Sequence, residues 1–103
     1  MRTFSPKDAI ETVVLTMDFT ADLNSGETLS GAPSVTVVVV QGTDPSVSSM
    51  LVGAPVISGN TVQQVVTAGV DGAAYGVTGG CGTSQGRILA IGGILPVQNA
   101  YLQ

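Results

Sequence analysis

The sequence predicts an all-β protein, a small β-sandwich of about seven strands. Valine dominates its apolar residues, and β-branched side chains favour strands over helices. Turn residues recur roughly every 8–12 positions, which is the spacing of turns in all-β sandwiches. With 103 residues there is room for one modest core, so we expect a single domain over residues 1–103.

Both termini are expected to be extended segments outside the strands of the sandwich. Residues 1–9 contain Pro6 and mixed charges, which is typical of an extended arm. Residues 98–103 would form a tail after the last strand. Between them, residues 10–20 alternate apolar and polar side chains with the period of two expected for a half-buried strand. The side chains predicted to share its buried face are Val13, Leu15, Met17 and Phe19.

The next segments are a connection and a valine-rich strand. Residues 21–33 are rich in Asn, Ser, Gly and Pro, so we expect a loop with brief edge pairing around residues 28–30. Residues 35–40 are valines except for Thr36. Because apolar residues occupy both faces of this strand, it is either central and covered twice, or its outer face docks on a neighbouring molecule.

Short strands follow at residues 47–52 and 56–57. They are separated by Gly53 and Pro55, which suit the edge of a sheet better than its centre. After a turn, residues 61–68 are predicted to form a further strand.

The chain is organised around its last hairpin, residues 69–97. Tyr75 and Val77 alternate onto one face of the first strand of this hairpin. Residues 82–86 contain the turn, and Arg87 opens the final, apolar strand.

Several classes of functional site lack the residues that they need. The chain has no His and a single cysteine, Cys81, so a structural zinc site and an internal disulfide are excluded, and a nucleophile would lack an activating base. Alternation places Cys81 on the inward face as a small apolar residue. The glycine-rich residues 79–86 lack the Lys of a phosphate loop, and Gln85 replaces a glycine of a dinucleotide loop. Asp18 and Asp22 offer too few oxygens for calcium, which needs about six or more. We predict no catalytic, cofactor or metal site, and no enzyme activity.

The charge distribution points to a protein partner. Three basic residues and a net charge of −4 argue against nucleic acid. No apolar signal segment opens the chain, and the apolar residues 88–97 are about half the length of a membrane span, so we expect neither secretion nor membrane insertion. Between Pro45 and Gln103 only Asp71 and Arg87 are charged. A surface with so few charges is poorly protected against association, so we infer that other subunits cover much of this half.

Two apolar stretches form the candidate assembly interface, one within residues 35–40 and one at residues 88–95. An outer apolar face or an unpaired strand edge offers apolar and main-chain contacts to a partner. The alternative is that both strands are central and covered on both faces. The candidate interface residues are Val38, Val40, Ile88, Ala90, Ile94 and Leu95.

The last hairpin resembles a known arrangement. The order Gly72-x-x-Tyr75-x-Val77, followed by residues 83–87 and an apolar strand, resembles the F and G strands of immunoglobulin-like domains. This resemblance implies an immunoglobulin-like sandwich in which Tyr75 hydrogen-bonds back across a corner that contains Gly72.

A narrower resemblance covers most of the chain. The segment FSPKD at residues 4–8, the pair Asp18-Phe19, the segment GETL at residues 26–29 and the hairpin with Gly86-Arg87 resemble the immunoglobulin-like fiber-tail adaptor proteins of tailed bacteriophages. The resemblance implies a non-enzymatic virion protein, made in the host cytoplasm, that joins tail or neck to fibers by binding other virion proteins in multiple copies.

Two other functions stay open at this point. One is a capsid decoration protein on the phage head. The other is a monomeric carbohydrate- or receptor-binding module, for which only Tyr75 and Tyr101 could stack on a sugar.

Overall fold

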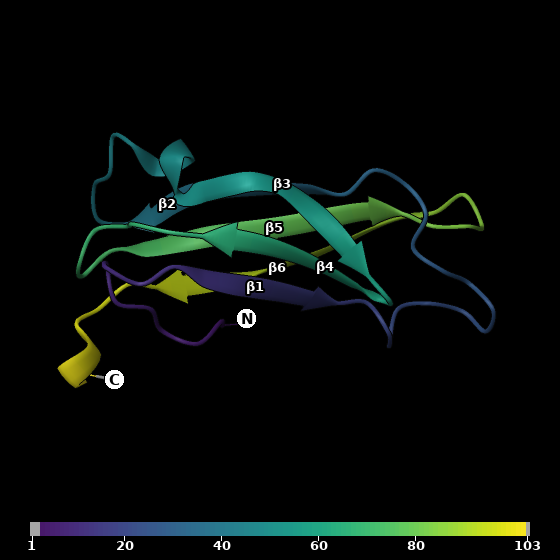
Figure 1. Ribbon diagram of the computed structural model, residues 1–103, viewed down its shortest axis with the longest axis horizontal. Helices are drawn as coiled ribbons and strands as arrows, with labels where there is room; N and C mark the ends of the chain where they lie inside the picture. The colour runs from purple at the N-terminus through teal and green to yellow at the C-terminus, as the bar shows by residue number, and fades with distance from the viewer. Residues whose placement is uncertain (1–2, 103) are drawn as a thin grey trace.

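The computed structural model describes residues 3–102, and in these residues six strands form two antiparallel three-stranded sheets (Figure 1). The first sheet has the order β1 (Val13–Asp18), β4 (Thr61–Val66), β3 (Leu51–Ser58). The second has the order β2 (Ser34–Gln41), β5 (Ala74–Gly82), β6 (Ile88–Pro96). Two short 3-10 helices, η1 (Val47–Met50) and η2 (Ala100–Leu102), complete the regular structure of this part of the chain. The predicted small all-β sandwich is confirmed.

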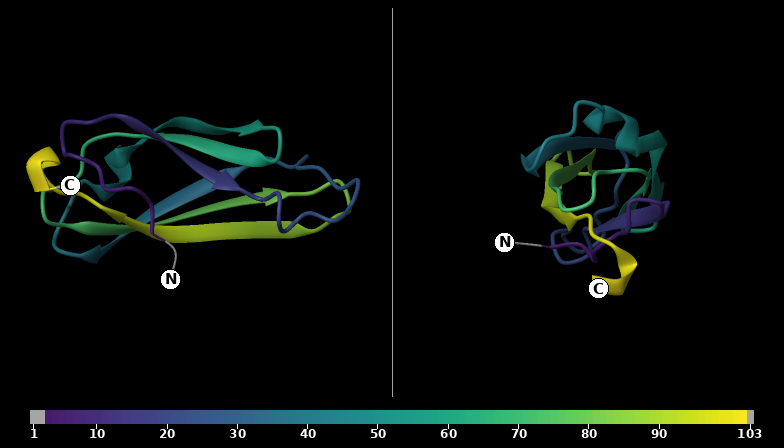
Figure 2. Two further views of the ribbon diagram at one scale, coloured as in Figure 1. Left: turned by 90° about the horizontal axis from the view of Figure 1, so that it is seen from below. Right: turned by 90° about the vertical axis from the view of Figure 1, so that its left-hand side faces the viewer.

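The two sheets stack face to face, as the two views of Figure 2 show. β1 packs against β6, β4 against β5, and β3 against β2. Each strand turns alternate side chains into the space between the sheets, so the core is drawn from both layers. The largest buried apolar side chains are Tyr75, Phe19, Met17, Met50 and Leu95.

The predicted alternation of the first strand is confirmed. Leu15, Met17 and Phe19 are buried, and Val13 is partly buried. The strand itself is shorter than predicted, because a turn occupies residues 9–10 before it.

The last hairpin also forms as predicted. β5 and β6 pair from Ala74↔Pro96 to Gly82↔Ile88, and the turn lies between them. Tyr75, Val77 and Cys81 all point inward and are buried. The brief edge pairing expected around residues 28–30 is a single bridge between Leu29 and Thr83.

The segment before and within β3 differs from the prediction. Residues 47–50 form a 3-10 turn instead of a strand, because Ser49 Oγ donates to the Ser46 carbonyl and gives the backbone a local alternative to a ladder. Residues 51–58 are then one strand, interrupted only by a register shift between Val52 and Val56. Gly53, with φ of 69°, adopts the left-handed conformation that this irregularity requires. The predicted edge position of this strand is confirmed.

The N-terminal segment lies along the outer edge of β6. Thr3 and Lys7 form parallel bridges to Ile94 and Val97. The Phe4 N–H donates to the Ile94 carbonyl at 2.8 Å. Residues 3–7 therefore extend the second sheet beyond β6, before the chain turns back into β1 (Figure 2, left).

Candidate assembly surface

The register of the second sheet brings the two predicted apolar stretches onto one surface. Val38 pairs with Gly76, and Gly76 pairs with Ile94, so these three residues form one row across β2, β5 and β6. We call the side of this sheet that points away from the first sheet the outer face. It carries no charged residue. Its members are Ser34, Thr36, Val38, Val40, Ala74, Gly76, Thr78, Gly80, Gly82, Ile88, Ala90, Gly92, Ile94 and Pro96.

The side chains in the middle of the outer face are small, so they project little from the sheet. The central strand β5 contributes only Ala, Gly and Thr to this face. Val38 and Val40, with 57% and 52% of their surface exposed, lean over the central glycine. A Cβ at Gly76 would lie 3.2 Å from Val40 and 3.3 Å from Val38, so this glycine allows the two valines to pack there. At the far end of the face, Ile88 is 85% exposed.

Not every predicted interface residue lies on this face. Ala90 is exposed, and Ile94 is partly buried where residues 3–4 pair beside it. Leu95 is fully buried opposite Tyr75, so its assignment to the interface is wrong. Neighbouring residues of a strand point to opposite faces, and Leu95 therefore belongs to the core.

The alternative in which the chain itself covers both faces is wrong for β2. This strand lies at the edge of its sheet. Within residues 3–102, Val38 and Val40 keep about half of their surface exposed. Their apolar surface is therefore available to another molecule.

Tyr75 forms a buried polar contact at the other end of the fold from the hairpin turn. Its Oη accepts a hydrogen bond from the Val70 N–H at 2.8 Å and donates one to Asp44 Oδ2 at 2.9 Å. Burial raises the pKa of this hydroxyl. Gly72 turns the chain in the left-handed conformation, with φ of 84°, and its N–H donates to the Val97 carbonyl. The tyrosine thus connects the corner to the loop after β2, a partner that the sequence analysis did not foresee.

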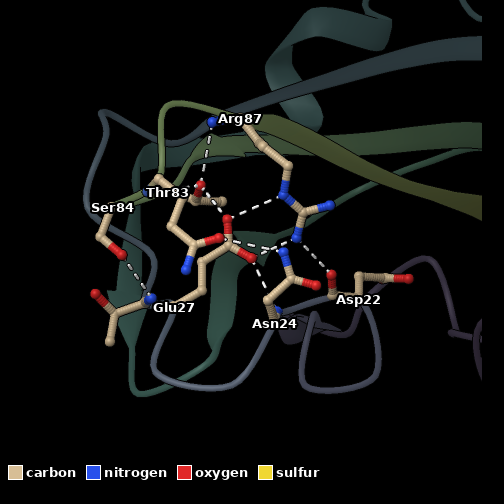
Figure 3. A network of polar contacts seen from close by, with 8 residues as sticks. Asp22, Asn24, Glu27, Thr83, Ser84 and Arg87 are labelled. Atoms are coloured by element: carbon tan, nitrogen blue, oxygen red, sulfur yellow. Dashed lines mark hydrogen bonds and ion pairs between the residues drawn. The ribbon is translucent and has the colours of Figure 1, made fainter.

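A polar network at the hairpin turn was also missed (Figure 3). The side chain of Glu27 has no exposed surface. Arg87 donates to both of its carboxylate oxygens, from Nε to Oε2 at 3.0 Å and from Nη2 to Oε1. Thr83 Oγ1 donates to Oε2 at 2.5 Å. The hydrogen bonds from Arg87 are the main reason that the pKa of Glu27 falls to about 2.

The same network fastens the loop between β1 and β2 to the hairpin. Asn24 donates its N–H to Glu27 Oε1 at 2.9 Å, and Arg87 Nη2 donates to the Asp22 carbonyl at 2.8 Å. Asn24 Nδ2 also reaches Gln85 Oε1. The sequence contains one signal for this network. Arg87 is the only basic residue after Lys7, and a cation that becomes partly buried needs an acidic partner, so an ion pair with Arg87 could have been expected.

The acidic residues do not form a metal centre in the described part of the chain. No group of three or more His, Cys, Asp or Glu side chains among residues 3–102 could hold a metal ion. Asp18 is exposed at the end of β1, and its carboxylate accepts from the N–H and the hydroxyl of Thr20. Among the same residues, no helix is long and apolar enough to cross a membrane.

Comparison with known families gives a match over most of the chain. A family model described as "Podophage GP4 fiber-tail adaptor protein gp77" matches residues 7–92. The matched region includes all of β1 to β5, the Glu27–Arg87 network and the first part of β6. The comparisons with curated proteins and with solved structures found no match.

Proposed function

Because the chain belongs to the podophage fiber-tail adaptor family, we propose that it is a structural virion protein that joins the tail or neck of a tailed phage to its fibers. The family is a structural one and not an enzyme class. The mechanism is binding: the sandwich docks on other virion proteins, and several copies act together in the particle. In this proposal the protein is made in the host cytoplasm and assembled there into the virion.

The observation that carries the proposal is the uncharged outer face. The nine charged residues of the described chain all lie elsewhere: Lys7, Asp8, Glu11, Asp18, Asp22, Glu27, Asp44, Asp71 and Arg87. A partner can therefore cover this face without removing a charge from water, which would cost several kcal/mol for each unpaired ion. Covering an exposed Val or Ile side chain contributes on the order of 1 kcal/mol in favour of binding.

A carbohydrate-binding module fits the structure less well. Tyr75 is fully buried, so it cannot stack on a sugar. Among the aromatic residues of the described chain, Tyr101 is the one with a largely exposed ring. A single exposed ring is a poor platform for a saccharide chain.

Labelling of intact particles tests the proposed location. Gold-conjugated antibodies to the protein are applied to purified virions and viewed by electron microscopy. We expect gold at the neck or tail, at the bases of the fibers. Label spread over the head would instead assign the protein to capsid decoration, and particles without label, despite accessible epitopes in disrupted virions, would overturn the virion assignment.

A further inference from the structure

β1 has a free edge within residues 3–102. It pairs with β4 on one side and lies at the margin of its sheet. The Phe19 N–H donates to the Asn60 carbonyl at 2.9 Å, which continues the β1–β4 ladder by one residue. Because hydrogen-bonded residues alternate along an antiparallel ladder, Leu15 and Met17 also bond toward β4. The N–H and C=O groups of Val14 and Thr16 therefore point away from the sheet.

A groove of about 270 Å³ lies along this free edge. One of its walls is β1, from Val13 to Thr16, and the other is the N-terminal segment, residues 4–7. That segment is itself bonded to β6, since the N–H groups of Phe4 and Lys7 donate to the carbonyls of Ile94 and Pro96. The groove is therefore a slot between the edges of the two sheets. In the left view of Figure 2, β1 and the N-terminal segment that form its walls lie on the side turned toward the viewer. Apolar side chains from both walls line it.

The solvent-exposed charge at the slot is negative. The ammonium of Lys7 is buried and donates to the carbonyls of Asp8 and Ala68. Glu11 also lines the slot, and its Oε1 accepts from the Asp8 N–H. A cation brought in by a partner can therefore reach the exposed Glu11 carboxylate from solvent, although the buried Lys7 ammonium nearby also attracts that carboxylate.

We propose that this slot binds an extended segment of another protein, which adds to β1 as a further strand. The outward N–H and C=O groups of Val14 and Thr16 supply the main-chain hydrogen bonds. Alternate side chains of the segment enter the apolar slot, and a Lys or Arg of the segment lies beside Glu11. A second copy of this chain fits less well, because the described basic side chains, Lys7 and Arg87, are both already engaged within the fold. This inference stands on the geometry of the slot and does not depend on the adaptor role or on the outer face.

The first test uses synthetic peptides of about eight residues in which Val alternates with Lys, with a matched series in which Val alternates with Glu. Amide hydrogen exchange of the protein is followed by NMR. With the Lys series, we expect the exchange rates of the Val14 and Thr16 amides to fall about tenfold or more. The exchange rate of the Leu15 amide, which is already bonded to β4, should change little. Equal binding of the Glu series, or protection confined to the outer face, would overturn the proposal.

Backbone-methylated peptides test strand addition without changing the protein. N-methyl groups at alternate residues of the Lys peptide, placed in either phase, remove the donors that a strand edge needs. We expect at least one phase to abolish the protection of Val14 and Thr16. If both methylated peptides bind as well as the unmodified one, the contact is not strand addition.

Variants of the slot complete the test. Glu11→Gln keeps an acceptor for the Asp8 N–H but removes the charge, so affinity for the Lys peptide should fall about two- to fivefold. Val14→Pro removes an N–H that is not part of the β1–β4 ladder and should abolish binding, while Val14→Ala keeps the N–H and should retain most of it. Unchanged binding in both Glu11→Gln and Val14→Pro would contradict the proposal.

Discussion

The Arg87 guanidinium holds the Glu27 carboxylate through two hydrogen bonds, although the residues lie 60 positions apart in the chain. This pair joins the loop before β2 to the turn between β5 and β6 (Figure 3). Because the Glu27 side chain has no exposed surface, its charge depends on Arg87 and on its other hydrogen bonds for stabilisation. The ion pair therefore orders the end of the sandwich at which the hairpin turns.

Acid should destabilise the protein through Glu27. The unfolded chain takes up a proton at this residue near pH 4.5, but the folded chain does so only near pH 2, where the lowered pKa of Glu27 lies. The free energy of unfolding therefore falls as the pH is lowered through this window. Glu27→Gln should make that fall shallower, as measured by urea denaturation at several pH values. Part of the slope should remain, because hydrogen bonds from Ile10 and Thr20 also lower the pKa values of Asp8 and Asp18. Identical slopes for both proteins would contradict this role of Glu27.

Removal of the Tyr75 hydroxyl should destabilise the corner. Tyr75→Phe leaves the Val70 N–H without its acceptor and Asp44 without one of its donors. We expect the free energy of unfolding to fall by about 1–2 kcal/mol, measured by chemical denaturation. Tyr101→Phe is the matched control, because that ring is largely exposed, and it should have little effect. An unchanged denaturation midpoint in Tyr75→Phe would remove the corner assignment.

The buried ammonium of Lys7 should hold the N-terminal segment in place. Lys7→Met keeps most of the aliphatic volume but leaves the carbonyls of Asp8 and Ala68 without this donor. We expect a loss of about 1–3 kcal/mol in unfolding free energy, together with faster amide exchange at Gln98, whose N–H donates to the Lys7 carbonyl. Ser5→Ala, an exposed change in the same segment, serves as the control. Equal stability of the two variants would show that the ammonium contributes nothing.

The sequence predicts the strands of this fold where a period of two is clear. β1 and the β5–β6 hairpin follow from alternating side chains, and the position of Cys81 follows from the same parity. Valine propensity predicts a strand at residues 47–50, but the local hydrogen bonds between Ser49 and the Ser46 carbonyl favour a 3-10 turn there. The apolar run at residues 88–95 does not by itself separate outward from inward side chains, and strand parity places Leu95 in the core.

The contacts of the candidate sites were less predictable than the strands. Arg87 donates a hydrogen bond to Glu27, and Tyr75 donates one to Asp44, although the two residues of each pair lie far apart in the sequence. Such pairs depend on how loops cross the ends of the sandwich, and local periodicity carries no information about this. The free edge of β1 likewise becomes visible only when the strand order is known.

Incorporation of a Val38→Glu variant into phage particles tests the central claim, that the outer face docks on the virion. Val56→Glu is the matched control, since Val56 is 55% exposed against 57% for Val38 but lies on β3 in the other sheet. Thermal unfolding first establishes that both variants remain folded, and mass spectrometry of purified virions then counts the copies of each. We predict that Val38→Glu is lost from the particles while Val56→Glu is present at the wild-type level. Wild-type incorporation of a folded Val38→Glu protein would contradict the account.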